Sequence, residues 1–144
     1  MSTNCYERAV HLLSQREHSL FELKQKLERK GFSDVEINAS LQQCQDEGYQ
    51  SDDRYCELYV RQAMSKGYGP LRIVQSLKIK GVCTSLIQEH LDFDDDIWFE
   101  HAEQAWKKKF KPSKEPKEMA KQKRFLYHRG FESAIINKLI NTRY

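Results

Sequence analysis

Apolar residues recur along this chain at helical spacing, in short blocks that glycines separate. In the first block, residues at positions i, i+3, i+4 and i+7 are apolar, which is the pattern of a helix with one buried face. Those residues are Tyr6, Ala9, Val10 and Leu13. No β pattern competes with the helical one over residues 1–48. The spacing therefore predicts an all-α fold.

Capping signals divide residues 1–48 into three expected helices. The second and third begin with capping boxes, in which a serine and a glutamate three residues later bond each other's backbone N–H groups. The two boxes are Ser19 with Glu22 and Ser33 with Glu36. Gly31 and Gly48 end these helices. The expected buried stripes are Leu20, Leu23 and Leu27, and then Val35, Ile37, Leu41 and Cys44.

The clearest helix pair lies in the stretch Ser51–Val82. Asp52 and Asp53 occupy the first turn of its first helix, where carboxylates complement the exposed amides. Gly67 is expected to end this helix, Pro70 to begin the second helix, and Gly81 to end that one. The expected buried residues are Leu58, Tyr59 and Ala63 in the first helix and Ile73, Val74 and Leu77 in the second.

Helices are also expected after this pair, the first from Thr84 to about Leu91. Trp98, Trp106 and Phe110 then recur at spacings of 8 and 4, which indicates a buried helical face rather than rings for base stacking. Residues 111–116 hold two prolines and predict a loop. The apolar sets of the last two expected helices are Met119, Phe125 and Leu126, and then Ala134, Ile135, Ile136, Leu139 and Ile140.

One short sequence motif recurs at the end of the second helix of each expected triplet. KGF at 30–32, KGV at 80–82 and RGF at 129–131 lie 50 and 49 residues apart. The leucines four residues before the glycines are Leu27, Leu77 and Leu126. This period predicts three copies of a three-helix unit, at residues 1–49, 50–93 and 94–144. Such small units bury little surface alone, so we expect them to stack as one domain with an elongated, curved shape.

Composition is that of a folded protein without a membrane span. The chain has 144 residues, of which 39% are hydrophobic and 31% charged, and it contains no run of 18 apolar residues. The N-terminus lacks the features of a signal peptide. Four cysteines lie without CxxC pairing, three of them in apolar stripes, so reduced thiols are expected and two disulfides are the alternative. We therefore expect a cytoplasmic protein.

Charge is distributed unevenly. Residues 101–144 hold 12 Lys and Arg against four Glu, a net charge of +8, whereas residues 1–100 hold 12 against 17 Asp and Glu, a net charge of −5. A basic end of this kind indicates an acidic partner, such as nucleic acid or an acidic protein surface. Solvated helix faces are the equally weighted alternative.

Motifs for catalysis or metal binding are missing from the sequence. Gly67-Tyr68-Gly69 precedes Pro70 rather than a lysine, and no strand comes before it, so a phosphate loop is not expected. The five histidines are dispersed, and none pairs with a cysteine at metal-ligand spacing. No arrangement of nucleophile and base can be proposed. The sequence thus predicts a non-enzymatic protein without cofactor or metal.

Some basic residues have a structural explanation, and others do not. Lys30, Lys80 and Arg129 share one repeat position at a helix C-terminus, where a cation offsets the helix dipole. Arg72 aligns with Glu22 and Lys121 instead, so the repeat does not explain its charge. Arg72 is therefore a better candidate for partner contact than the three cations at helix ends.

Candidates for contact with DNA phosphates or an acidic protein surface lie in two parts of the chain. Tyr68, at a turn between glycines, is expected to be partly exposed, either against a partner or beside the following helix. Arg61 could also shield apolar surface with its stem. The candidates are Arg54, Arg61, Lys66, Tyr68 and Arg72 in the central unit, and Lys107, Lys108, Lys109, Lys111, Lys121 and Arg124 in the third.

The stretch SDDRYCELYVRQAMSKGYGPLRIVQSLKIKGV at 51–82 resembles the central motif of the RecX family, bacterial regulators of the RecA recombinase. The segments SLFELKQKLERKGF, GYQSDDRY and KQKRFLYHRGF are also similar to that family, so the likeness covers nearly the whole chain. Two departures are Gln50, where the family more often has an apolar residue, and Ser76, where an acidic residue is frequent.

The resemblance implies three tandem three-helix repeats and a non-enzymatic, monomeric regulator. It implies binding along the groove of RecA filaments, which would block their extension or destabilise them. ATP hydrolysis, strand exchange and the SOS response would then fall, and with them DNA recombination and repair. Single-stranded or double-stranded DNA is left open as a second partner. The alternative is a DNA-binding protein whose units act as helix-turn-helix modules, which the basic third unit favours.

Overall fold

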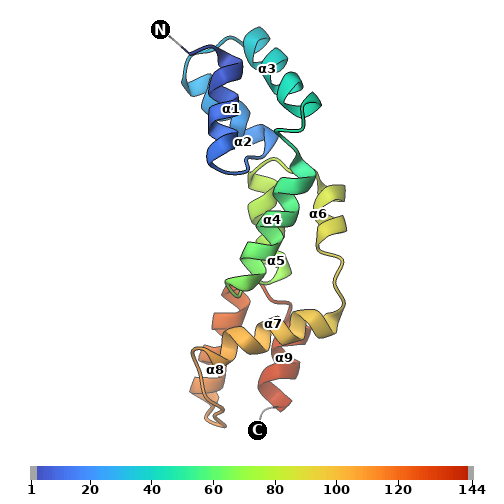
Figure 1. Cartoon of the computed structure of the whole chain (residues 1–144). Helices are drawn as coiled ribbons and strands as arrows, with labels where there is room; N and C mark the ends of the chain where they lie inside the picture. Colours follow the sequence, from blue (N-terminus) through green and yellow to red (C-terminus); the bar gives the residue numbers. More distant parts are fainter. Residues whose placement is uncertain (1–2, 143–144) are drawn as a thin grey trace. The chain divides into compact units, whose positions relative to one another are not determined.

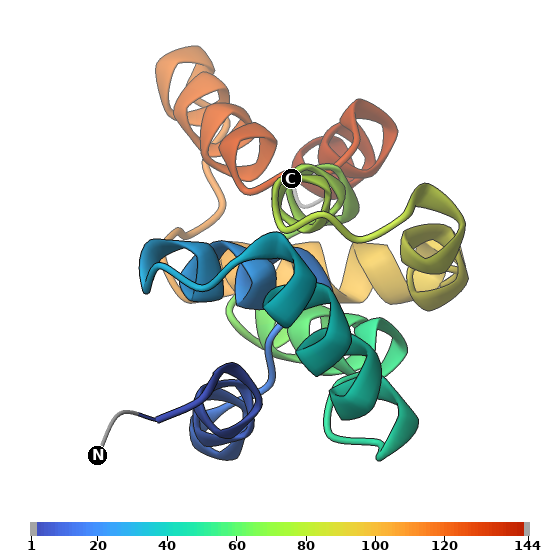
Figure 2. The same cartoon turned by 90° about the horizontal axis from the view of Figure 1, so that it is seen from above.

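The computed structural model of this chain describes residues 3–142, and that part consists of helices and their connections (Figure 1). Figure 2 shows the same helices from above, again without a strand in the described residues. The helices are α1 (Cys5–Gln15), α2 (Leu20–Arg29), α3 (Asp34–Asp46), α4 (Asp52–Ser65), α5 (Pro70–Ile79), α6 (Thr84–His90), α7 (Asp95–Lys107), α8 (Pro116–His128) and α9 (Ser133–Thr142). The prediction of an all-α fold is confirmed, and the helices form the expected triplets.

The helix ends follow the predicted capping chemistry. Both capping boxes are present: the side chains of Ser19 and Ser33 accept from the backbone N–H of Glu22 and Glu36, whose carboxylates accept in return. Pro70 begins α5 as expected. Residues 108–115 connect α7 to α8, so the expected loop is present, but Pro116 already begins α8. Local sequence signals therefore place most helix boundaries.

The described chain folds into two compact units, which divide the helices of the middle triplet between them. Unit 1 comprises Met1–Leu58 and Leu77–Ile87, and unit 2 comprises Tyr59–Ser76 and Gln88–Tyr144. The core of unit 1 is a cluster from α1, α2 and α3: Cys5, Ala9, Leu23, Leu27, Ile37, Leu41 and Cys44. Leu23 and Leu27 are fully buried, as the helical spacing predicts.

Unit 2 buries both tryptophans of α7 together with apolar residues of α8 and α9. Trp98 and Trp106 are 6% and 3% exposed, which confirms that they belong to the core. The indole Nε1 of Trp106 donates to Gln122 Oε1 at 2.8 Å, and Gln122 Nε2 donates to the carbonyl of Lys111 at 3.0 Å. Since Gln122 is fully buried, these bonds supply the partners that its amide would otherwise lack.

Each unit contains the same junction between two successive repeats. In unit 1, the Ser19 hydroxyl at the start of α2 donates to the Lys80 carbonyl at 2.7 Å, beside Gly81. In unit 2, the N–H groups of Gly69 and Leu71 at the start of α5 donate to the Arg129 and Gly130 carbonyls, at 2.7 and 3.0 Å. The second helix of one repeat thus begins against the glycine turn of the next repeat.

The apolar stripe of α4 differs from the prediction. Tyr55, Cys56, Val60, Ala63 and Met64 are its buried residues, whereas Leu58 and Tyr59 are only half-buried. Of the three expected residues, only Ala63 is therefore right. The error is a choice between neighbouring faces, because a helix dense in apolar residues offers more than one stripe with helical spacing.

Three further expectations about burial are corrected. Val35 is 80% exposed and Ala134 is exposed, so neither belongs to the core of its helix. Val74 is half-buried, while its neighbours on the α5 stripe, Ile73 and Leu77, are 1% and 0% exposed. Both exposed residues lie within the first two turns of their helices, α3 and α9, where single apolar side chains at the surface are common.

All four cysteines lie in the described residues and carry free thiols. Cys5, Cys44 and Cys56 are buried, as expected from their places in apolar stripes, and Cys83 is exposed. Burial raises the pKa of the Cys56 thiol to about 11, so this group stays protonated near neutral pH and behaves as a small apolar side chain.

His18 is held in its neutral form inside unit 1. Its side chain is 1% exposed, with Nδ1 3.0 Å from the Arg16 carbonyl and Nε2 2.9 Å from Lys26 Nζ. A carbonyl only accepts and an ammonium only donates, so the ring carries its proton on Nδ1 and accepts through Nε2. Burial, together with the Arg16 and Lys26 charges, lowers the pKa of His18 below 6.5, although the hydrogen bond to the Arg16 carbonyl and the Glu22 charge oppose the shift.

Acidification should therefore destabilise the protein before its carboxylates titrate. The unfolded chain binds a proton at His18 at higher pH than the folded chain, so stability is complete above 6.5 and falls as the pH drops below that value. We expect urea midpoints to decrease between about pH 7.5 and pH 5.5, and to decrease less in Lys26→Gln, which removes the facing charge. A flat profile, or an equal slope in the variant, would contradict this role of His18.

Candidate functional site

The predicted contact residues are divided between the two units. Arg54 belongs to unit 1, and the other candidates belong to unit 2. Its Nε is 2.7 Å from the Glu17 carboxylate, and its Nη2 donates to the Tyr49 carbonyl at 3.0 Å. The side chain is partly exposed, so it holds the start of α4 against the α1–α2 connection while one edge faces solvent. Its role in partner binding stays a prediction.

In unit 2, the turn before α5 and the end of α8 bring cations and aromatic rings together. The Arg72 guanidinium lies 4.2 Å from the centre of the Tyr68 ring, and the Arg129 guanidinium covers the same ring at 5.2 Å. Arg129 also lies 4.9 Å from the Phe125 ring, which Lys109 covers at 4.6 Å. We call this alternating series the cation–aromatic ladder: Arg72, Tyr68, Arg129, Phe125, Lys109 and Phe110.

The ladder decides the question that the sequence left open about Tyr68. Its ring is half-buried and packs within the chain, against two guanidinium groups. Arg72 also donates through Nη1 to the His128 carbonyl at 3.3 Å. Contacts of this kind contribute about 0.5–1 kcal/mol each at exposed sites, so Tyr68 and Arg72 help to join the two repeats of unit 2. Their further role in partner binding stays a prediction.

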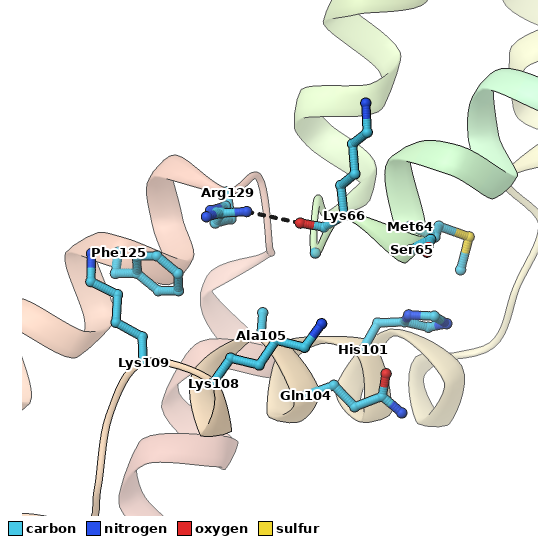
Figure 3. A pocket seen from close by; sticks show the side chains of 11 residues that line it. Met64, Ser65, Lys66, His101, Gln104, Ala105, Lys108, Lys109, Phe125 and Arg129 are labelled. Carbon is cyan, nitrogen blue, oxygen red and sulfur yellow. Dashed lines mark hydrogen bonds between the residues drawn. The ribbon is translucent and has the colours of Figure 1, made fainter.

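A pocket of about 130 Å³ opens next to the ladder, between the end of α4, one side of α7 and the last turn of α8 (Figure 3). We call it the basic pocket, after the four cations among its lining residues: Lys66, Lys108, Lys109 and Arg129. His101 and Gln104 of α7 also line it, and no carboxylate does. None of the four cations has a carboxylate partner among the described residues.

Arg129 is the most constrained side chain of the basic pocket. Its Nη1 donates to the Lys66 carbonyl at 2.9 Å, the bond drawn as a dashed line in Figure 3. The rings of Tyr68 and Phe125 cover the same guanidinium. This bond satisfies a carbonyl at the end of α4, and the rings restrict the rotamers of the arginine. The remaining N–H groups of Arg129 have no partner in the described chain.

The other predicted residues lie outside the basic pocket. Lys107 pairs with Glu103 one turn earlier on α7, at 3.7 Å. Lys111 accepts the Gln122 amide through its carbonyl, and its side chain is exposed. Arg61 on α4 and Lys121 and Arg124 on α8 are exposed. The structure thus brings Lys66, Lys108 and Lys109 together at the pocket, and Tyr68 and Arg72 together at the ladder, to which Lys109 also belongs.

Sequence reasoning missed Arg129 and His101 as members of the site. The repeat position that Arg129 shares with Lys30 and Lys80 points only to the helix dipole. One signal was available: only this copy has an arginine, whose planar guanidinium can stack on rings and donate in several directions. His101 offered no comparable signal, because it lines the pocket only through the placement of α7 beside α4.

Neither a metal site nor a membrane span is found in residues 3–142. No group of three or more histidine, cysteine, aspartate or glutamate side chains there could hold a metal ion. No helix in that range is both long and apolar enough to cross a membrane.

Family models identify all three repeats of this chain. The model described as RecX, first three-helix domain, matches residues 5–44, the second domain matches 51–91 and the third matches 95–140. A Regulatory protein RecX from Legionella pneumophila is 45% identical over 139 residues, covering 95% of this chain and 93% of the relative. The chain belongs to the RecX family. The resemblance of its central stretch is thereby confirmed.

Other RecX proteins and their structures agree with this assignment. Regulatory protein RecX from Vibrio parahaemolyticus is 44% identical, over 87% of this chain and 82% of the relative, and that from Haemophilus influenzae is 40% identical, over 92% and 90%. The crystal structure of RecX from Lactobacillus salivarius superposes with a TM-score of 0.84, over 96% of this chain and 93% of that one. At 24% identity, this likeness shows the RecX fold, an all-α array of three-helix repeats.

Proposed function

We propose that this RecX-family chain binds RecA nucleoprotein filaments and inhibits their extension and activities. The observation that carries the proposal is the match of all three repeats, in order, to the three domains of the RecX family. The curated relatives bear the name Regulatory protein RecX, which supports a regulatory role. Through the filament, the chain would lower recombination, repair and the SOS response in the cytoplasm.

Non-enzymatic inhibition is the form of regulation that the described chain supports best. Repeat arrays present extended surfaces of contact and commonly bind partners without chemistry at a single site. The basic pocket gathers four cations and no carboxylate, a lining suited to binding an anionic group of a partner. We infer that the protein acts as a monomer, by occupying filament surface.

ATP hydrolysis by RecA on single-stranded DNA tests this function. Sub-stoichiometric or stoichiometric amounts of the protein should lower the steady-state rate, and the effect should persist when the DNA is pre-coated with RecA. If hydrolysis is unaffected, or falls only when the protein is in excess over free DNA and coats it first, the protein acts on DNA rather than on the filament. That outcome would replace the proposed function with the DNA-binding alternative.

Arg72→Glu should weaken inhibition of the filament. The change reverses a charge at an exposed position of α5, and we expect about tenfold more protein to be required for half-inhibition. The lost contacts to Tyr68 and the His128 carbonyl should cost only about 1 kcal/mol of stability, because Arg72 is exposed. Thermal melts of both proteins check that the variant remains folded.

Lys78→Glu is the matched control, since Lys78 is also exposed on α5 and the change in net charge is equal. It should inhibit like the unmodified protein. If both variants lose inhibition equally, long-range charge and not a contact at Arg72 is responsible. If neither does, Arg72 is not part of the surface that binds the filament.

A further inference from the structure

We propose that the basic pocket binds a phosphate group of a nucleic-acid backbone. The proposal concerns the protein without RecA, and it is independent of the proposed function. It rests on three properties of the pocket: a fixed guanidinium, an excess of positive charge over the helix ends nearby, and lysines spread to both sides of that guanidinium.

Arg129 supplies the fixed donor. Because Nη1 is bonded to the Lys66 carbonyl and two rings cover the guanidinium, the side chain loses little further conformational freedom when it binds an anion. The planar fork of an arginine matches two oxygens of a phosphate group. A lysine at this position, as in the first two repeats, has no planar fork with which to hold the Lys66 carbonyl and present two further donors to a phosphate.

Positive charge in the pocket exceeds what helix termini explain. Lys66 follows the last residue of α4, and Lys108 and Arg129 are the C-caps of α7 and α8, so each offsets a helix dipole. Each C-terminus carries roughly half a negative charge, and three of them sum to roughly −1.5 against four cations. With no carboxylate lining the pocket, roughly 2.5 positive charges remain for an external anion.

The placement of the lysines favours a chain of phosphates over a single acidic group. Figure 3 shows Lys108 lying along α7 beneath the end of α4, whereas Lys66 extends from the end of α4 and Lys109 lies beside Phe125, on the other side of Arg129. One phosphate in the pocket would leave those two lysines for its neighbours along a strand. Residues 101–144 as a whole, the pocket cations Lys108, Lys109 and Arg129 included, carry a net charge of +8, which extends the positive field. A single glutamate or aspartate of a protein partner would use only part of this charge.

Affinity for a fluorescent oligothymidylate, measured over a series of salt concentrations without RecA, tests the proposal. Lys108→Gln should weaken binding about three- to tenfold and reduce the slope of log K against log salt by about 0.7, the value for one phosphate contact on a single strand. Lys117→Gln is the matched control, because it removes an equal charge from an exposed position of α8 outside the pocket. Lys117 precedes Arg129 by twelve residues, or roughly 18 Å along the helix.

Amide chemical shifts decide between phosphate and an acidic protein group. Inorganic phosphate and the oligonucleotide should both shift the amides of residues 64–67, 104–109 and 125–129, and a poly-glutamate peptide at equal charge should shift them less. Equal loss of DNA affinity in the Lys108 and Lys117 variants would overturn the proposal, since binding would then be diffuse. Stronger shifts with poly-glutamate than with either phosphate probe would also overturn it, in favour of an acidic protein partner.

Discussion

Leu77→Ala should lower the free energy of unfolding by about 2–5 kcal/mol. Leu77 is fully buried in α5 and stands four residues before Gly81, the position that Leu27 and Leu126 occupy in the other repeats. Alanine is a good helix former, so the loss would come from the removed apolar atoms and the cavity that they leave. Since a domain of this size is stable by about 5–15 kcal/mol, a large part of the stability would be lost.

Ile79→Ala is the control for this change, two residues later on α5. Ile79 is 74% exposed, so its truncation should change the stability by less than about 0.5 kcal/mol. Urea denaturation followed by helical circular dichroism would measure both variants. A Leu77 variant with the stability of the Ile79 variant would show that Leu77 is not part of a packed core. Equal large losses in both would show instead that α5 itself is damaged by alanine, whichever face carries it.

The repeat makes much of the fold predictable from the sequence. Leu27, Leu77 and Leu126 align through their distance from the glycine stops alone, and all three are 0% exposed. Capping boxes and glycine stops depend on residues three or four apart, so local chemistry is sufficient to place them. The buried face of α4 is not predictable in the same way, because its apolar residues leave two neighbouring stripes open.

The candidate site is less accessible to sequence reasoning because it is built between repeats. The bond from Arg129 to the Lys66 carbonyl joins residues 63 apart, and that from Arg72 to the His128 carbonyl joins residues 56 apart. No periodic pattern marks such pairs. Lys66, Tyr68 and Arg72 stand out in the sequence because the repeat does not explain them, and two of these three join the repeats of unit 2 through their side chains.

A residue that departs from a repeat is therefore not always available for a partner. Arg72 departs because it meets Tyr68 and the end of α8, whereas Glu22, at the aligned position, completes a capping box and pairs with Arg16 and Lys80. The junction between repeats thus shapes both positions, and each repeat pair uses different chemistry there. This is why Arg72→Glu needs a readout of filament inhibition beside one of stability.

Gly130→Ala should destabilise the protein by about 2–4 kcal/mol, more than the conformation of the glycine explains. Gly130 has φ of +94°, where alanine costs about 1 kcal/mol. A Cβ there would also lie 2.5 Å from both Arg72 Cβ and Arg72 N, because α5 begins against this turn. Relief of such a clash must displace backbone, which typically adds about 1–3 kcal/mol. Urea denaturation would measure the loss, and amide exchange at Leu71 would report the broken junction.

Gly31→Ala is the control that separates the two contributions to the loss of stability, the conformation of the glycine and the close approach at the junction. Gly31 holds the same repeat position with φ of +90°, yet nothing lies within 4 Å of a Cβ built on it. Within residues 3–142, no helix start packs on that turn, whereas Phe21 meets Gly81 and Arg72 meets Gly130. The Gly31 variant should therefore lose only about 1 kcal/mol. Equal losses at Gly31 and Gly130 would show that φ alone requires these glycines, and that the close approach between repeats contributes nothing to stability.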